Sequence, residues 1–209
     1  MGKLRARTEA EFAARREEIL AAAGKLIMTQ DYSEVSLTAI AEKTSISRPS
    51  MYNYYETREL VFADLMLREY EKWRIALLER LSEPQSKEKF CEIMVDILWE
   101  REILLKLLSL QLSVWDHHYS EDTIIRFQHG VVPFAQALYT VMKIQFPNAT
   151  DEAINQFRIQ FTVYCNSLYA LAHLPQCQMQ ALEESNVFGS IPAPRQISFE
   201  GLMLLTSNL

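Results

Sequence analysis

The stretch "SISRPSMYNYYETRE", residues 45–59, gathers side chains whose hydrogen-bonding groups suit a nucleic-acid surface. An arginine can bind guanine through two parallel hydrogen bonds, and an asparagine can bind adenine in the same way. Tyrosine hydroxyls can donate to phosphate oxygens. Arg48 would stand at the start of a helix, where the helix dipole disfavours a cation unless an anion such as phosphate lies beside it. These residues predict contact with DNA through Arg48, Tyr52, Asn53 and Tyr54.

The helical pattern of the segment assigns this contact to one face. We expect a short helix over residues 48–54. At roughly 100° per residue, Met51 and Tyr55 point to the core, whereas Pro49 and Asn53 point away from it. The outward face carries no acid, unlike the Glu- and Lys-rich face of an ordinary surface helix. On geometry alone, a helical corner in an ordinary bundle stays open as the alternative.

Helical periodicity supplies the elements that must position this segment. A helix over residues 8–29 and a short one over residues 37–43 precede it, in the order of a helix-turn-helix, with Ser36 and Ser47 as N-caps. Further helices are predicted at 57–82, 86–100, 102–118, 121–146 and 151–174, with a last short helix from residue 198. The chain has only 5 glycines and no Asn-Gly or Asp-Gly hairpin signal, so we expect an all-α fold.

Two places should interrupt these helices. Gly130 and Pro133 fall inside the helix at 121–146, which we therefore expect to bend or break there. Residues 185–196 contain glycine and two prolines and are expected to form a loop.

The stretch "SLTAIAEKTSISRPSMYNYYETREL", residues 36–60, resembles the helix-turn-helix signature of the tetracycline-repressor (TetR) family of transcriptional regulators. The likeness runs without a gap over residues 9–75, and the positions that match the signature are Ser36, Ile40, Ala41, Ile46, Ser47, Ser50, Met51, Tyr52, Tyr54, Tyr55, Thr57, Arg58 and Glu59. It implies an N-terminal DNA-binding head of three helices with a helix-turn-helix, residues 1–60. It also implies a C-terminal helical bundle for dimerisation and ligand binding, residues 61–209, and the helix 57–82 links the two domains. Thr44-Ser45 stands where the family has Ala-Gly, and Pro49 stands where glycine is common.

The resemblance also assigns residues. Phosphate contacts fall to Ser36, Thr38, Ser47, Tyr52, Tyr54 and Arg58, and base contacts to Arg48, Pro49, Ser50 and Asn53. It implies a homodimer formed through residues 151–174 and 198–208, a double-stranded DNA operator, and a small-molecule effector that releases a repressor from a palindromic site. The candidate effector pocket is rich in large apolar side chains with two polar ones: Trp99, Leu108, Trp115, Phe127, Phe134, Phe161, Tyr164, Asn166, Tyr169 and His173. Residue by residue, plain core packing is the alternative.

Charge is distributed unevenly along the chain. The net charge is −6, but residues 1–60 hold nine basic and nine acidic residues, so residues 61–209 carry all of the negative excess. Lys3, Arg5 and Arg7 precede the first acid, which lets one end of the protein approach an anion. The three cysteines lack metal-ligand spacing and indicate reduced thiols. With no signal peptide and no sufficiently apolar run, we expect a cytoplasmic protein without a membrane span.

Two other classes of function, a helical-bundle enzyme and a protein-binding adaptor, agree less well with the sequence. For a helical-bundle enzyme, "WDHHYSED", residues 115–122, is the one cluster with metal-ligand chemistry, but consecutive residues diverge on a helix and cannot close on one ion. We therefore expect no enzyme activity, cofactor or metal. A protein-binding adaptor without DNA recognition would present an acidic or apolar face around Asn53, which the sequence does not have.

Overall fold

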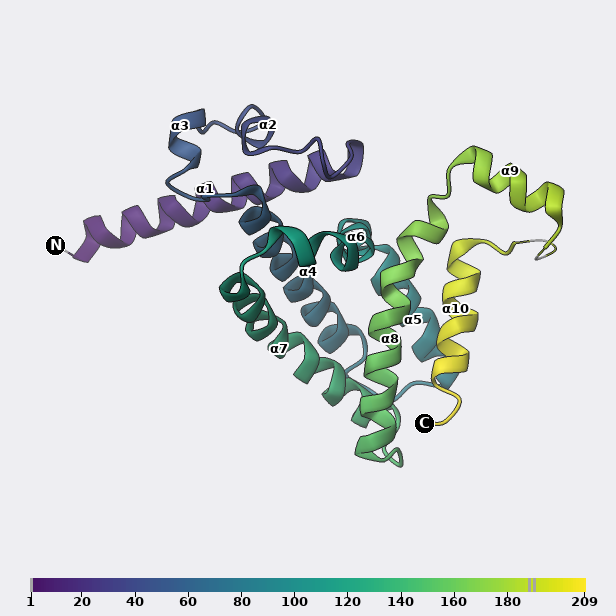
Figure 1. Ribbon diagram of the computed structural model, residues 1–209. Helices are drawn as coiled ribbons and strands as arrows, with labels where there is room; N and C mark the ends of the chain where they lie inside the picture. Colours follow the sequence, from purple (N-terminus) through teal and green to yellow (C-terminus); the bar gives the residue numbers. More distant parts are fainter. Residues whose placement is uncertain (1, 188, 190) are drawn as a thin grey trace. The chain divides into compact units, whose positions relative to one another are not determined.

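The computed structural model describes residues 2–187, 189 and 191–209, and the side chains of residues 8–111, 119–187, 189 and 191–209. In this described part the chain forms α-helices and no strand, which confirms the all-α prediction (Figure 1). The helices are α1 (Gly2–Thr29), α2 (Leu37–Ala41), α3 (Arg48–Met51), α4 (Arg58–Arg80), α5 (Lys87–Trp99), α6 (Glu102–His118), α7 (Glu121–Gln145), α8 (Asp151–Ala172), α9 (Gln176–Ser185) and α10 (Pro194–Leu205).

The helices form two compact units. The first unit comprises Met1–Arg68 and His117–Gly130, and the second comprises Glu69–Asp116 and Val131–Leu209. The helices α4 and α7 each contribute residues to both units. The first unit is larger than residues 1–60, because the start of α4 and the start of α7 pack with α1 to α3.

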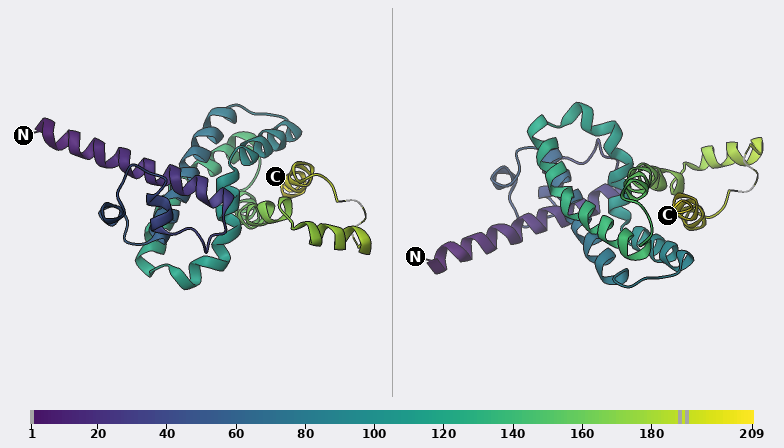
Figure 2. Two further views of the ribbon diagram at one scale, coloured as in Figure 1. Left: turned by 90° about the horizontal axis from the view of Figure 1, so that it is seen from above. Right: turned by 90° about the horizontal axis from the view of Figure 1, so that it is seen from below.

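The core of the first unit is built from α1, α2, α3 and the start of α4. It includes Ile19, Ala23, Ile27, Ile40, Met51, Val61 and Phe62, each at most 1% exposed. Ser36 caps α2 by accepting a hydrogen bond from the Ala39 backbone N–H at 3.1 Å, and Ser47 caps α3 in the same way. The helix α1 begins at Gly2 instead of Thr8, so its N-terminal part extends beyond α2 and α3 (Figures 1 and 2).

The helix was expected to bend or break at Gly130 and Pro133; a break is wrong, because α7 continues as one helix through both residues, and a bend stays a prediction. A proline removes the hydrogen bond to the carbonyl four residues earlier, here that of His129. Both Pro133 and His129 are exposed, so water can solvate this carbonyl. Packing of Phe134, Leu138 and Val141 on the opposite face stabilises the helix despite the lost bond.

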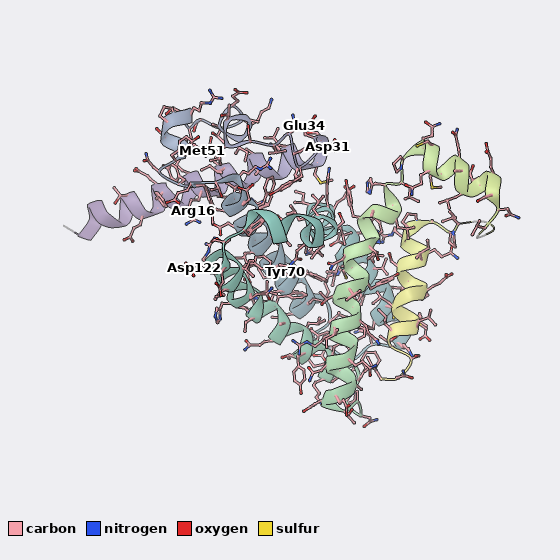
Figure 3. All side chains as sticks on the ribbon, viewed as in Figure 1. Arg16, Asp31, Glu34, Met51, Tyr70 and Asp122 are labelled. Carbon is pink, nitrogen blue, oxygen red and sulfur yellow. The ribbon has the colours of Figure 1, made fainter. Side chains whose placement is uncertain are left out.

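Aromatic side chains fill the core of the second unit. The ring of Trp73 in α4 lies 4.3 Å from that of Phe134 in α7 and 5.8 Å from that of Phe161 in α8, between ring centroids. Tyr70, labelled in Figure 3, packs on both Trp73 and Phe134. The helix α10 lies against α5 and α8. A glycine is needed at 201, because a Cβ there would lie 2.3 Å from the hydroxyl oxygen of Tyr164 in α8.

The C-terminal helices differ from the predicted pattern. The helix α8 ends at Ala172 because Pro175 follows, and α9 then begins directly after that proline. The sequence analysis did not predict α9, which has no buried residue and extends away from α8 and α10 (Figures 1 and 2). The helix α10 begins at Pro194, four residues before the expected start. None of the helices in the described part combines the length and apolar character that a membrane span needs.

Candidate DNA-binding interface

The orientation of the recognition segment agrees with the predicted face. Met51 and Tyr55 are buried at 1% and 3% exposure, whereas Pro49 and Asn53 are exposed, which confirms the inward and outward assignment. The helix is shorter than predicted and ends at Met51. The next residues form tight turns, in which the N–H groups of Asn53 and Tyr54 bond to carbonyls only three residues earlier. A turn, not a helix, therefore presents Asn53.

The structure brings Arg48 and Thr38 together. The Nε of Arg48 donates to the hydroxyl oxygen of Thr38 in α2 at 2.7 Å. Ser47 and Ser50 share a hydrogen bond between their hydroxyls at 2.8 Å. Arg48 is exposed, so its guanidinium is accessible to a ligand at the start of α3 while its Nε is held by Thr38.

The two tyrosines of the segment differ in exposure. Tyr52 is 60% exposed, so its hydroxyl is accessible to a phosphate. Tyr54 is half-buried, and its ring stacks on that of Phe12 in α1, with 4.7 Å between ring centroids. Phe12 therefore braces the segment from α1, a contact that sequence spacing did not reveal.

The guanidinium group of Arg58 bonds to several groups of the protein itself. Its NH1 donates to the backbone carbonyls of Tyr32, Ser33 and Val35, each at 3.0 Å, and its Nε donates to Glu59 at 2.9 Å. Its guanidinium also lies over the ring of Tyr32, 4.7 Å from the centroid. These contacts hold the chain that leads into α2. They give Arg58 a structural role, and the phosphate contact that the resemblance implied stays a prediction.

The unusual turn between α2 and α3 is held by a residue that sequence analysis missed. The carboxylate of Glu18 in α1 accepts hydrogen bonds from the backbone N–H of Ser45 at 2.5 Å and from its hydroxyl at 3.0 Å. Arg15 pairs with the same carboxylate at 2.8 Å and also donates to the Ser45 hydroxyl. The backbone bond from Ser45, followed by the Arg15 bond, lowers the pKa of Glu18. Ser45, where the family has glycine, thus anchors the turn to α1.

We expect Glu18→Ala to weaken operator binding several-fold, because the turn that sets the angle of α3 loses its acceptor. Glu18→Gln, which keeps a side-chain oxygen, should retain most of the affinity. Since the pKa of folded Glu18 is lowered, its contribution to stability is complete above the unfolded pKa and is lost as pH falls through the folded one. Operator titration and unfolding curves of both variants between pH 3 and pH 7 measure these effects. If Glu18→Ala and Glu18→Gln behaved alike, Glu18 would not hold the turn through Ser45.

A second group of missed residues surrounds Asp64 in α4. Its Oδ2 accepts from the hydroxyl of Tyr55 at 3.0 Å and pairs with Arg16 of α1, and its Oδ1 pairs with Arg126 of α7 at 3.0 Å. We call these four residues the Asp64 cluster; Arg16 is labelled in Figure 3. Burial, together with the nearby Asp64 carboxylate, raises the pKa of Tyr55 to about 12, so that its hydroxyl stays a donor. The cluster joins α1, α4, α7 and the end of the recognition segment.

The predicted effector-pocket residues do not form one group. Phe134 and Phe161 lie in the aromatic core around Trp73, and Leu108 is buried in the same unit. Trp99 and Tyr164 instead bond to α10, through the Ser198 hydroxyl at 3.0 Å and the Ile197 carbonyl at 2.8 Å.

The remaining members of the predicted pocket lie elsewhere. Tyr169 stacks on His173 near the end of α8, and His173 pairs with Glu102 at 3.2 Å. Asn166 has a buried side-chain oxygen, and Phe127 belongs to the first unit. Trp115 and the candidate ligands Asp116, His117 and His118 have side chains outside the described residues. Among the described residues, no group of three or more His, Cys, Asp and Glu side chains could hold a metal ion.

Comparison with known proteins adds to this geometry. Residues 19–65 match the family model for bacterial regulatory proteins of the TetR family, and residues 67–192 match a tetracyclin repressor-like C-terminal domain. No curated protein matches the chain at a significant level.

Solved structures share the fold over nearly the whole chain. The fatty acid degradation regulator FadR from Bacillus halodurans has a TM-score of 0.63 at 13% identity and covers 93% of this chain and 96% of that chain. A putative TetR-family regulator from Mesorhizobium loti has a TM-score of 0.58 at 15% identity, covering 93% and 97%. Mycobacterium smegmatis AmtR has a TM-score of 0.50 at 17% identity, covering 91% and 84%.

The two family models lie one after the other and together span most of the chain, and α2 and α3 form the helix-turn-helix inside the first. The chain therefore belongs to the TetR family and is a transcriptional regulator with a DNA-binding helix-turn-helix.

Proposed function

We propose that the protein is a cytoplasmic repressor that binds a palindromic operator as a homodimer and is released by a small apolar or aromatic ligand. The observation that supports DNA recognition best is the exposed, acid-free face of the α3 segment. Arg48, Pro49 and Asn53 lie on it, with Tyr52 beside them. We assign base contacts to Arg48, Pro49, Ser50 and Asn53 and phosphate contacts to Ser36, Thr38, Ser47, Tyr52, Tyr54 and Arg58.

Selection of binding sites from random DNA should return an inverted repeat, with half-sites in successive major grooves. On that site, Asn53→Ala should cost about 1–3 kcal/mol and relax discrimination at one base position, because one bidentate base contact is lost. Tyr52→Phe is the matched control: losing a phosphate contact should weaken all sequences alike. A selection without a palindrome would contradict the dimeric operator.

The homodimer is proposed through α8 and α10. Ile159 and Val163, one turn apart on α8, are 68% and 65% exposed, and Leu204 on α10 is 74% exposed. Residues 159–172 contain no charged side chain. A charge-free helix face with exposed aliphatic side chains is typical of a surface that a partner covers. TetR-family regulators generally bind DNA as dimers, which supports the same arrangement.

Effector release needs two arrangements of the DNA-binding units in the dimer, of which the ligand favours the one that no longer matches the groove spacing. A hundredfold difference in affinity, about 2.7 kcal/mol, is enough for useful switching. A thermal-shift screen of apolar metabolites and drugs, followed by operator titration with each hit, tests this step. Ligands that stabilise the protein without changing operator affinity would refute the switch.

A further inference from the structure

Three buried polar atoms of the second unit have no hydrogen-bond partner among the described residues. They are the indole Nε1 of Trp73, the Nε of Arg101 and the side-chain oxygen of Asn166. Buried polar groups in native proteins are almost always paired, so each exception needs a physical reason. Two of the three are N–H donors. The amide of Asn166 can present either an acceptor or, after rotation, a donor.

Trp73 is the most deeply buried of the three, at 2% exposure. Its ring packs against Tyr70, Phe134 and Phe161, and this packing accounts for an aromatic side chain. It does not provide an acceptor for the indole N–H, whereas a phenylalanine at this position would bury no donor. The chain does satisfy its other described indole: the Nε1 of Trp99 donates to the buried hydroxyl of Ser198 at 3.0 Å.

Arg101 adds a second donor beside the same helix. Its side chain is 13% exposed, and its NH2 donates to the carbonyl of Lys72, the residue before Trp73, at 3.2 Å. Burial lowers the pKa of its guanidinium. Its NH1 donates to the carbonyl of Ile97 and lies 3.7 Å from the carboxylate of Glu100. Trp73 and Arg101 therefore each bury one N–H donor that has no acceptor among the described residues.

We propose that Trp73 is the hydrogen-bonding anchor of the effector site, and that its effectors carry an oxygen acceptor, a carbonyl or a carboxylate, on an aromatic body. This inference rests on the proposed effector function and adds the chemistry of the ligand to it. The rings of Tyr70, Phe134 and Phe161 contact the aromatic body, and the Nε1 of Trp73 donates to the oxygen. Arg101 favours the carboxylate form.

The test uses the full chain and three probes that share one ring system: 2-ethylnaphthalene, 2-acetylnaphthalene and 2-naphthoate. We expect the wild-type protein to bind the ketone and the carboxylate at least fivefold more tightly than the hydrocarbon, as one neutral hydrogen bond would give. In Trp73→Phe this preference for the ketone should disappear, while affinity for 2-ethylnaphthalene stays the same. Without probe, Trp73→Phe removes an unpaired buried donor but leaves a small cavity, so its unfolding temperature should fall by less than that of Trp99→Phe.

Trp99→Phe is the matched control, since it removes an indole donor that Ser198 already accepts. It should lower the unfolding temperature and leave the preference for the ketone unchanged. Equal binding of the three probes to wild type, failure of all three to bind, or a ketone preference that survives Trp73→Phe would each overturn the assignment of Trp73. The proposed effector function is judged separately, by whether any screened ligand that stabilises the protein also lowers its operator affinity.

Discussion

Replacing both Ile159 and Val163 with aspartate should convert the protein to a monomer and lower its operator affinity at least about 100-fold. Two heads joined in one dimer bind two half-sites with a high effective concentration, and this gain of about 10²–10⁴ is lost when they separate. The two carboxylates would have to be buried without partners in an apolar interface, which makes association strongly unfavourable. Sedimentation at micromolar concentration should give the 24.3 kDa mass of one chain.

The control for this variant carries the same two changes elsewhere in the second unit. Ile75 and Val132 are aliphatic and 41% and 43% exposed, on α4 and α7. Ile75→Asp with Val132→Asp should stay dimeric and bind the operator, and circular dichroism should show that both double variants keep their helices. If the α8 variant still sediments as a dimer, or if it binds the operator as well as wild type does, the proposed interface is wrong.

Local periodicity predicted the orientation of the recognition segment. Met51 and Tyr55 are four residues apart, so their burial, and the exposure of Pro49 and Asn53, follows from helical geometry alone. The length of α3 was less predictable. The N–H of Tyr55 bonds to the Met51 carbonyl, as it would in a continuous helix. Tyr55 therefore points in nearly the same direction in a helix and in the observed turns, so its burial does not reveal where α3 ends.

The residues that hold the segment could not be predicted in this way. Glu18 and Ser45 are 27 positions apart, and Arg126 lies 62 positions from Asp64. Which exposed glutamate on α1 meets the turn depends on how α1 crosses α2, and a single sequence does not determine that crossing. The same limit explains the scattered pocket prediction: residue type indicated large apolar side chains, but only packing decides whether Trp99 contacts α10 or the aromatic core.

The helix α9 and the continuity of α7 were missed for a different reason. Pro133 was expected to bend or break the helix at 121–146, and Pro175 lies directly after the predicted helix at 151–174. Pro175 does end α8, but it also suits the start of the next helix. Pro133 is tolerated where it and His129, whose carbonyl it frees, are both exposed residues. Exposure of one backbone carbonyl therefore decides the effect of a proline, and the sequence does not reveal it.

Asp64→Ala should destabilise the first unit by about 2–3 kcal/mol. The hydroxyl of Tyr55, a residue only 3% exposed, loses the oxygen to which it donates. Arg16 and Arg126 lose their carboxylate too, although at 39% and 50% side-chain exposure they can be rehydrated, which keeps the cost below that of a fully buried pair. Urea unfolding followed by circular dichroism and by hydrogen exchange of α1 and α3 measures the loss.

Glu71→Ala provides the control on the same helix. Glu71 bonds Arg74 through both carboxylate oxygens at 2.7 Å, but its side chain is 51% exposed, so its loss should cost about 0.5 kcal/mol or less. Tyr55→Phe removes only the hydroxyl and should fall between the two. If Asp64→Ala lowered the free energy of unfolding no more than Glu71→Ala does, the Asp64 cluster would not hold α7 to α1.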